Sequence, residues 1–319
     1  MREGKIVIAK EIKKLNNNQN NYDHNSIDIL EDNIRKKMPE IFDILLIDRT
    51  TSTIKKTKNI IWANNNYIRY DKKKYSPTAQ ITPELVTGVM GQIIMPRALK
   101  PRQLQKERTK TKAEVFTPTR IVKAQNDEID KFYKNDELEK YVKRKWIEIT
   151  CGEGPYMATR YDMETGKKLL LNNRVGFVDR KLHRINSEID DKAEWQRLVE
   201  EAYKSSYGFE WSGDSLLLAR ENLLYTYRDY YIDKWQTEPI YGLFKTIAEI
   251  ISYNIFQMDG LKYTVPLTDK KERIAEFQMS LFDTEEPKDK WIIKPGKRVK
   301  IMNWNTNRME FFDKGVKKL

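Results

Sequence analysis

Three short apolar runs in the second half of the chain each end in or beside an acidic residue, and this pattern most constrains the fold. The runs are KWIEIT (residues 145–150), SYGFEW (206–211) and SYNIFQMD (252–259). Residues 190–205, 213–235 and 239–251 lie between them and repeat apolar side chains at helical spacing, and Pro239 opens the last of these helices. Strands that alternate with helices predict an α/β fold, a parallel sheet with helices on both faces.

The three strand ends predict a binding site. The carboxyl ends of parallel strands meet at one edge of a sheet, and ligands of such folds bind there. Glu148, Glu210 and Asp259 would meet at this edge. Each acid alone is explained as a loop or capping residue, but three neighbouring carboxylates repel one another unless they bind a shared polar ligand. Gly152 and Gly154 follow the first strand, where they would let that ligand approach the backbone closely.

The first half of the chain has a less regular pattern. Residues 16–26 are almost free of apolar side chains and predict a solvated loop, and residues 26–38 predict a helix. The runs IFDILLID (41–48) and NIIWA (59–63) have strand length and are expected to join a sheet. Residues 97–112 carry seven basic residues and one acid, and they form either a solvated linker or an arm that contacts phosphates.

Composition narrows the class of partner and the compartment. The chain has 319 residues and 59 lysines and arginines against 47 acids, a net charge of +12 that favours an acidic partner such as nucleic acid. One cysteine excludes an internal disulfide framework, and together with two histidines it predicts no zinc site. No apolar run approaches the ~20 residues that span a bilayer, and the first residues lack a signal-type apolar core, so we expect no membrane partner and a cytoplasmic protein.

Several segments resemble one enzyme family. EITCGEGPY resembles the first motif of S-adenosylmethionine-dependent DNA adenine methyltransferases, and AEVFTPTRIV (113–122) resembles the motif that precedes it in the N6-adenine enzymes. NIIWANNNYI, ITPELVTG, KAEVFTP, GDSLLLARENLL and NIFQMDGL are together similar to bacterial and phage proteins labelled restriction endonuclease subunit M. The resemblance covers most of the chain from residue 41 to the end. It implies a Rossmann-like cofactor-binding domain over residues 113–319, preceded by an N-terminal region of residues 1–112 that supplies sheet strands and the basic arm.

The resemblance implies that the cofactor is S-adenosyl-L-methionine and assigns residues to its adenine end. Phe116 would lie against the adenine ring, although periodicity alone favours core packing for this side chain. Thr117 and Pro118 would fix the turn that carries it, and Asp259 would accept a hydrogen bond from the adenine amino group.

The resemblance also assigns the rest of the cofactor. Glu148 would attract the amino group of the methionine end, and Glu210 would accept both ribose hydroxyls. Gly152 and Gly154 would admit the cofactor close to backbone amides, with Cys151 as a small packed side chain between the strand and the turn.

The chain departs from the family in its catalytic motif. The enzymes carry a tetrapeptide of Asp, Asn or Ser, two prolines and an aromatic residue, and this chain has no such tetrapeptide. Asn303 and Trp304 in IMNW fit the order of the motifs, whereas Asn64 and Tyr67 in NNNY fit the spacing of amide and aromatic side chain. The interval from Glu148 to the second strand is also long, which implies an insertion around residues 163–183.

Three functions are compatible with these observations. The first is a DNA methyltransferase of a restriction-modification type system, which transfers a methyl group to adenine N6 in double-stranded DNA and has a restriction nuclease or another subunit as a further partner. The second is a catalytically inactive relative that binds cofactor or DNA as a regulatory or assembly subunit. The third is a basic nucleic-acid-binding protein in which the strand-end acids are incidental.

Overall fold

A small parallel sheet lies at the centre of the protein. The computed structural model describes residues 31–100, 103, 105, 106, 110, 117–274 and 290–316. Its parallel strands have the order β1-β2-β3, with Trp146 opposite Ser206 and Gly208 opposite Ile255. They are β1 (Trp146–Glu148), β2 (Ser206–Glu210) and β3 (Ile255–Gln257). The α/β class and the three strands predicted between residues 145 and 259 are thereby confirmed, in a sheet of three strands.

Helices connect the strands in the alternation that the sequence predicts. The connection from β1 to β2 runs through α8 (Phe177–Glu188) and α9 (Lys192–Lys204), and that from β2 to β3 through α10 (Gly213–Trp235) and α11 (Tyr241–Asn254). Helix α9 begins where the Asp191 carboxylate accepts a hydrogen bond from the Glu194 N–H, at 2.8 Å. Helices α6 (Thr119–Asp130) and α7 (Leu138–Val142) precede β1.

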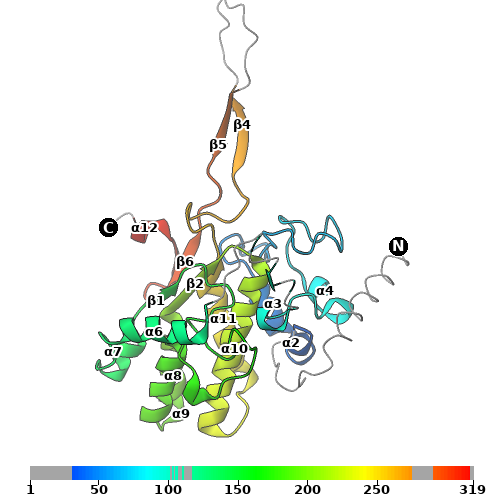
Figure 1. The fold of residues 1–319 in the computed structure, drawn as a ribbon. Helices are drawn as coiled ribbons and strands as arrows, with labels where there is room; N and C mark the ends of the chain where they lie inside the picture. The colour runs from blue at the N-terminus through cyan, green and yellow to red at the C-terminus, as the bar shows by residue number, and fades with distance from the viewer. Residues whose placement is uncertain are drawn as a thin grey trace, which may run out of the picture.

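The two faces of the sheet are covered differently. Leu216, Leu217 and Ile255 belong to a large buried cluster that the helices share with the N-terminal region. On the opposite face, Phe209 and Phe256 pack with Val299, Ile301 and Phe312, which lie in or directly beside an antiparallel hairpin. The hairpin lies next to the sheet (Figure 1). This hairpin consists of β6 (Lys300–Asn303) and β7 (Arg308–Phe311), followed by α12 (Asp313–Val316). Helices were expected on both faces of the sheet, but a hairpin covers the face that carries Phe209. The reason is that residues 300–303 pair with residues 308–311 and not with the parallel sheet.

The N-terminal region departs from its prediction. The run at residues 41–48 is not a strand, because Pro39 begins α3 (Pro39–Leu46), in which Ile41, Phe42 and Leu45 form a buried stripe. This helix packs against α11. Asn59 and Ile61 make isolated bridges, to Ile47 and Gln80, and residues 59–63 do not join the parallel sheet. Among its described residues, this region also contains the helical segments α2 (Glu31–Lys37), α4 (Pro83–Val86), η2 (Gly88–Met90) and η3 (Arg97–Leu99), and η4 (Leu171–Asn173) follows β1.

One side chain joins the extended N-terminal segment to the sheet. Gln257, the last residue of β3, accepts a hydrogen bond from the Ile61 N–H at 3.0 Å and donates to the Ile61 carbonyl at 2.8 Å. A buried amide side chain therefore replaces a strand pairing at this point, and it places residues 62–66 beside the carboxyl edge of the sheet.

A two-stranded ribbon extends from the body of the protein (Figure 1). It consists of β4 (Lys270–Ile274) and β5 (Lys290–Lys294), which pair antiparallel. In Figure 1 the ribbon lies at one end of the molecule, and α8 and α9 lie at the other. Across the part of the chain that the structure describes, no helix has the length and apolar character needed to cross a bilayer.

Candidate functional site

A cavity of about 750 Å³ lies at the carboxyl edge of the parallel sheet. Its size falls in the range of roughly 300–1,000 Å³ that is usual for small-molecule and cofactor sites. Most of its lining comes from the ends of β1 and β2, the turn after β1, the segment after residue 62 and the start of α10, and Pro77, Thr117 and Leu267 complete it. Its lining includes Asn64, Asn65, Asn66, Thr117, Glu148, Cys151, Gly152, Glu153, Glu210, Trp211, Ser212 and Leu267.

The turn after β1 requires its glycines. Gly152 and Gly154 both have positive φ, at +54° and +76°, where a side chain is strained. A Cβ on Gly152 would meet no atom within 4 Å, whereas a Cβ on Gly154 would lie 3.1 Å from Met157 Cε and 3.5 Å from Ala219 Cβ. Gly152 therefore borders open space at the cavity, and Gly154 allows the turn to pack closely against α10.

Glu148 binds the backbone that follows this turn. Its two carboxylate oxygens accept hydrogen bonds from the N–H groups of Tyr156 at 3.2 Å and Met157 at 2.9 Å. Burial raises the pKa of Glu148 to about 8, and the charge of Glu210 adds to this rise, although the two N–H donors oppose it. Burial therefore favours the neutral form of this carboxyl group, and a cation beside it would favour the ionised form.

Glu210 closes the opposite side of the turn. Its carboxylate accepts from the Gly152 N–H at 2.8 Å and from the Ser212 N–H at 3.1 Å, so the ends of β1 and β2 are joined at the cavity. Burial raises the pKa of Glu210 against the backbone donors that lower it, and the charge of Asp214 contributes to the rise. A carboxylate offers about four acceptor sites, so capacity remains for a ligand hydroxyl.

Cys151 is a buried wall residue of the cavity. Its N–H donates to the Phe209 carbonyl at 2.8 Å and extends the contact between β1 and β2. Burial raises the pKa of the thiol, and the charges of Glu148 and Glu210 raise it further, so the group stays neutral.

Only some of the residues expected to contact the adenine end of the cofactor lie at the cavity. Thr117 lines it, and Pro118 directly precedes α6, whereas Phe116 lies outside the described residues. Asp259 is not among the lining residues. Its carboxylate accepts from the N–H groups of Leu261 and Lys262, at 2.9 and 3.2 Å, and thereby caps the turn that follows β3.

Asn64 and Tyr67 share one buried acid. Asn64 lines the cavity and donates through Nδ2 to Asp214 Oδ1 at 2.8 Å, and its Oδ1 accepts from the Asn66 N–H at 3.1 Å. The Tyr67 hydroxyl donates to Asp214 Oδ2 at 2.7 Å, and this side chain is 3% exposed with its ring 4.8 Å from that of Trp62. Asn64 is thus near the cavity, while the Tyr67 ring is enclosed beneath it.

Asn303 and Trp304 lie at the other end of the strands. Asn303 ends β6 and accepts from the Asn305 N–H at 3.1 Å, as a turn residue does. Trp304 donates from Nε1 to Asn254 Oδ1 at 2.8 Å, and Asn254 directly precedes β3 and donates to the Ser206 carbonyl at 3.1 Å. The structure therefore does not bring these two residues to the cavity, because β6 belongs to the hairpin and not to the parallel sheet.

Trp211 is a site residue that the sequence reasoning missed. It lines the cavity directly after Glu210, and its indole Nε1 donates to the Ala63 carbonyl at 2.6 Å. Asn65 and Asn66 also line the cavity from the N-terminal region. The position of Trp211 beside the strand-end acid is a signal that the sequence contained, whereas the approach of the asparagines depends on long-range packing.

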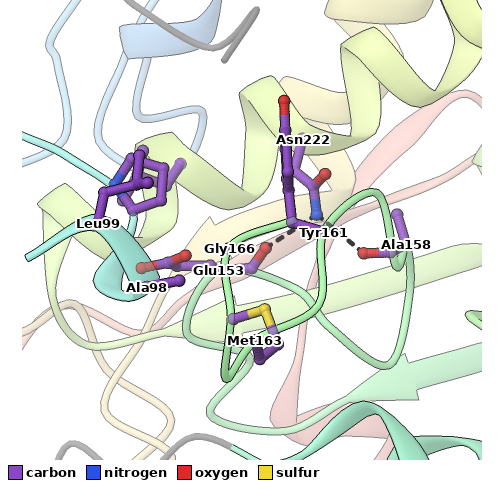
Figure 2. A pocket seen from close by; sticks show the side chains of 10 residues that line it. Ala98, Leu99, Glu153, Ala158, Tyr161, Met163, Gly166 and Asn222 are labelled. Atoms are coloured by element: carbon purple, nitrogen blue, oxygen red, sulfur yellow. Dashed lines mark hydrogen bonds between the residues drawn. The ribbon is translucent and has the colours of Figure 1, made fainter. Parts of the chain in front are cut away.

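A second, much smaller cavity lies behind Glu153 (Figure 2). It has about 30 Å³ and is lined in part by Ala98, Leu99 and Asn222. The Arg97 N–H donates to Glu153 at 2.8 Å, so the described start of the basic segment at 97–112 packs against the turn after β1. A cavity of this size has room for no more than one or two water molecules.

No protein-family model, no curated protein and no solved structure matches the chain significantly.

Proposed function

We propose that the cavity binds S-adenosylmethionine and that the protein is a DNA methyltransferase of a restriction-modification type system, acting on adenine N6. The observation that carries the proposal is the junction of Glu148, the glycine turn and Glu210 around one cavity at the carboxyl edge of the sheet. The sequence motifs around these residues resemble those of the adenine methyltransferases, and the sheet is compatible with a Rossmann-like fold.

The residues present fit this cofactor. Glu148 offers a carboxyl group that ionises beside a cationic amine, and Glu210 retains acceptor capacity for ribose hydroxyls. Trp211 presents an aromatic ring for the adenine, in a cavity whose glycine turn leaves open space at Gly152. S-adenosylmethionine supplies an electrophilic methyl group on a sulfonium sulfur.

The asparagine run supplies the polar groups nearest to a target base. Asn64, Asn65 and Asn66 line the cavity, and an amide oxygen of this run would accept a hydrogen bond from the target amine and orient it. Restricting the motion of the amine relative to the cofactor is the main contribution that such a site makes to the rate.

One observation favours the second function, in which the protein binds the cofactor without transferring the methyl group. The Asn64 amide is held by Asp214 and the Asn66 N–H, and the Tyr67 ring is enclosed, so the pair with the family spacing is engaged within the protein. Such a protein would serve as a regulatory or assembly subunit.

Calorimetric titration with S-adenosylmethionine tests the proposal. We expect Glu210→Ala to weaken binding more than tenfold, because charge-assisted hydrogen bonds to the ribose are lost. Glu249→Ala is the matched control, since Glu249 is an exposed acid on α11. Wild-type protein that binds no cofactor, or Glu210→Ala protein with wild-type affinity, contradicts the cofactor assignment.

Transfer of a labelled methyl group separates the two functions. Labelled S-adenosylmethionine and mixed-sequence duplex DNA should yield labelled N6-methyladenine if the protein is a methyltransferase. Tight cofactor binding with no label in DNA would assign the protein to the second function.

A further inference from the structure

The ribbon formed by β4 and β5 begins at the rim of the cavity. Leu267 lines the cavity, and β4 begins three residues later, at Lys270. Five residues per strand span about 17 Å, so the ribbon reaches well beyond the rim. In Figure 1 it extends away from the helices and from β6.

The root of the ribbon is fixed in direction. The Gly296 N–H donates to Asp269 Oδ1 at 2.8 Å, and the Lys297 N–H donates to Thr268 Oγ1 at 2.9 Å. A Cβ on Gly296 would lie 2.2 Å from Thr268 Oγ1, so only glycine allows the two strands to approach here. Because both strands are held where they leave the body, the ribbon keeps a defined orientation relative to the cavity.

One face of the ribbon combines cations with large apolar side chains. Lys271 lies opposite Ile293, and Arg273 lies opposite Trp291, so these four residues share a face. Trp291 is 57% exposed and Ile293 is 65% exposed. An isolated two-stranded hairpin is marginally stable in water, so a ribbon with such exposed side chains gains stability when a partner covers it.

The charge of the two strands favours an anionic partner. β4 and β5 together carry five basic residues and one acid, and that acid, Glu272, pairs with Lys294 at 2.5 Å. The connecting residues 275–289, which lie outside the described residues, contain five acids and one lysine, so the net positive charge of this segment lies on the strands. A two-stranded ribbon fits the major groove of B-DNA, which is about 12 Å wide.

We propose that the Lys271, Arg273, Trp291 and Ile293 face of the ribbon binds duplex DNA beside the cavity. This inference rests on the proposed function for its purpose, since it would hold a duplex where one of its bases can reach the cofactor cavity. The two cations contact phosphates, and the apolar side chains contact the groove edges or sugars.

Duplex binding across a range of salt concentrations tests the inference. The variant is Lys271→Gln/Arg273→Gln, and the probe is a mixed-sequence 30-base-pair duplex. We expect Kd at 100 mM salt to rise about tenfold or more, and the slope of log affinity against log salt to become shallower by about 2, since each phosphate contact contributes ~0.9. Trp291→Ala should weaken binding with little change in slope.

The matched control is Lys192→Gln/Arg197→Gln. These are also one exposed lysine and one exposed arginine, but they lie on α9 at the opposite end of the molecule (Figure 1). We expect this control to leave the salt slope nearly unchanged. Equal effects of the two double variants would overturn the inference, because net charge alone would then explain the binding.

Calorimetry with S-adenosylmethionine distinguishes this inference from the proposed function. Both double variants should bind the cofactor as the wild type does. Ribbon-dependent duplex binding by a protein that binds no cofactor would support the ribbon surface and contradict the methyltransferase. Wild-type salt dependence in the ribbon variant would overturn the inference.

Discussion

Replacing Asp214 with alanine should destabilise the protein by about 4 kcal/mol, because this acid joins the N-terminal region to α10. Asp214 is 1% exposed and accepts from Asn64 Nδ2 at 2.8 Å and from the Tyr67 hydroxyl at 2.7 Å. A hydrogen bond to a charged group contributes about 1.5–3 kcal/mol, so the loss of two amounts to about 3–6 kcal/mol. The residue also lies in the first turn of α10, where a negative charge contributes about 0.3–1 kcal/mol.

Urea unfolding measures this effect as a lower midpoint at an unchanged slope. Tyr67→Phe removes one of the two bonds and should cost about 1–3 kcal/mol. Asp191→Ala is a control in which a single exposed capping bond is lost at the start of α9, and it should cost about 1 kcal/mol. If Asp214→Ala cost no more than this control, the buried link between the two regions would not exist as described.

Three further predictions concern ionisation and the cofactor. Burial raises the pKa of Glu221 from 4.5 to about 8, so between these pH values the folded chain retains a proton that the unfolded chain has released. The free energy of unfolding should therefore fall by up to about 1.4 kcal/mol per pH unit over this range. Glu221→Gln should remove that part of the slope in urea titrations at pH 5, 6 and 7, and an unchanged slope would contradict the assignment. The pKa of Glu148 is raised to about 8, so its carboxyl group must release a proton when a cation binds beside it. Calorimetry should therefore show the affinity for S-adenosylmethionine rising up to about tenfold per pH unit from pH 6 to 8. This rise should be absent in Glu148→Gln. Trp211→Ala should weaken the same binding up to about tenfold through lost stacking, with Trp211→Phe close to wild type; equal losses would argue against a ring contact.

Local patterns sufficed for the central strands and helices. β1, β2 and β3 are short apolar runs separated by segments with helical periodicity. The spacing of the apolar residues and the length of each segment therefore predict the same type of element. Residues 41–48 show where this reasoning fails, because a run of eight mostly apolar residues suits a strand and a buried helix equally. Pro39 at the first helical position was the signal that decides between them.

The site was predictable only where it depends on strand order. Glu148 and Glu210 follow adjacent parallel strands, so their meeting follows from topology. Asn64 lies at the cavity because Asp214 and Gln257 hydrogen-bond to its segment. These contacts join residues more than 140 positions apart, and no local sequence pattern predicts them. The position of Asn303 could not be foreseen either, because the sequence does not distinguish a strand of the parallel sheet from one that pairs in its own hairpin.

The distribution of charge favours a cationic ligand in the cavity and an anionic one outside it. Glu148, Glu153 and Glu210 line the cavity, and among its described lining residues there is no lysine or arginine. A nucleotide with several phosphates would meet carboxylates without a compensating cation, whereas the ammonium and sulfonium groups of S-adenosylmethionine would be attracted. The chain as a whole has a net charge of +12, and five of its basic residues lie on the ribbon that begins at the cavity rim. Separate acidic and basic surfaces side by side suit a protein that must hold a cationic cofactor and a polyanion at the same time.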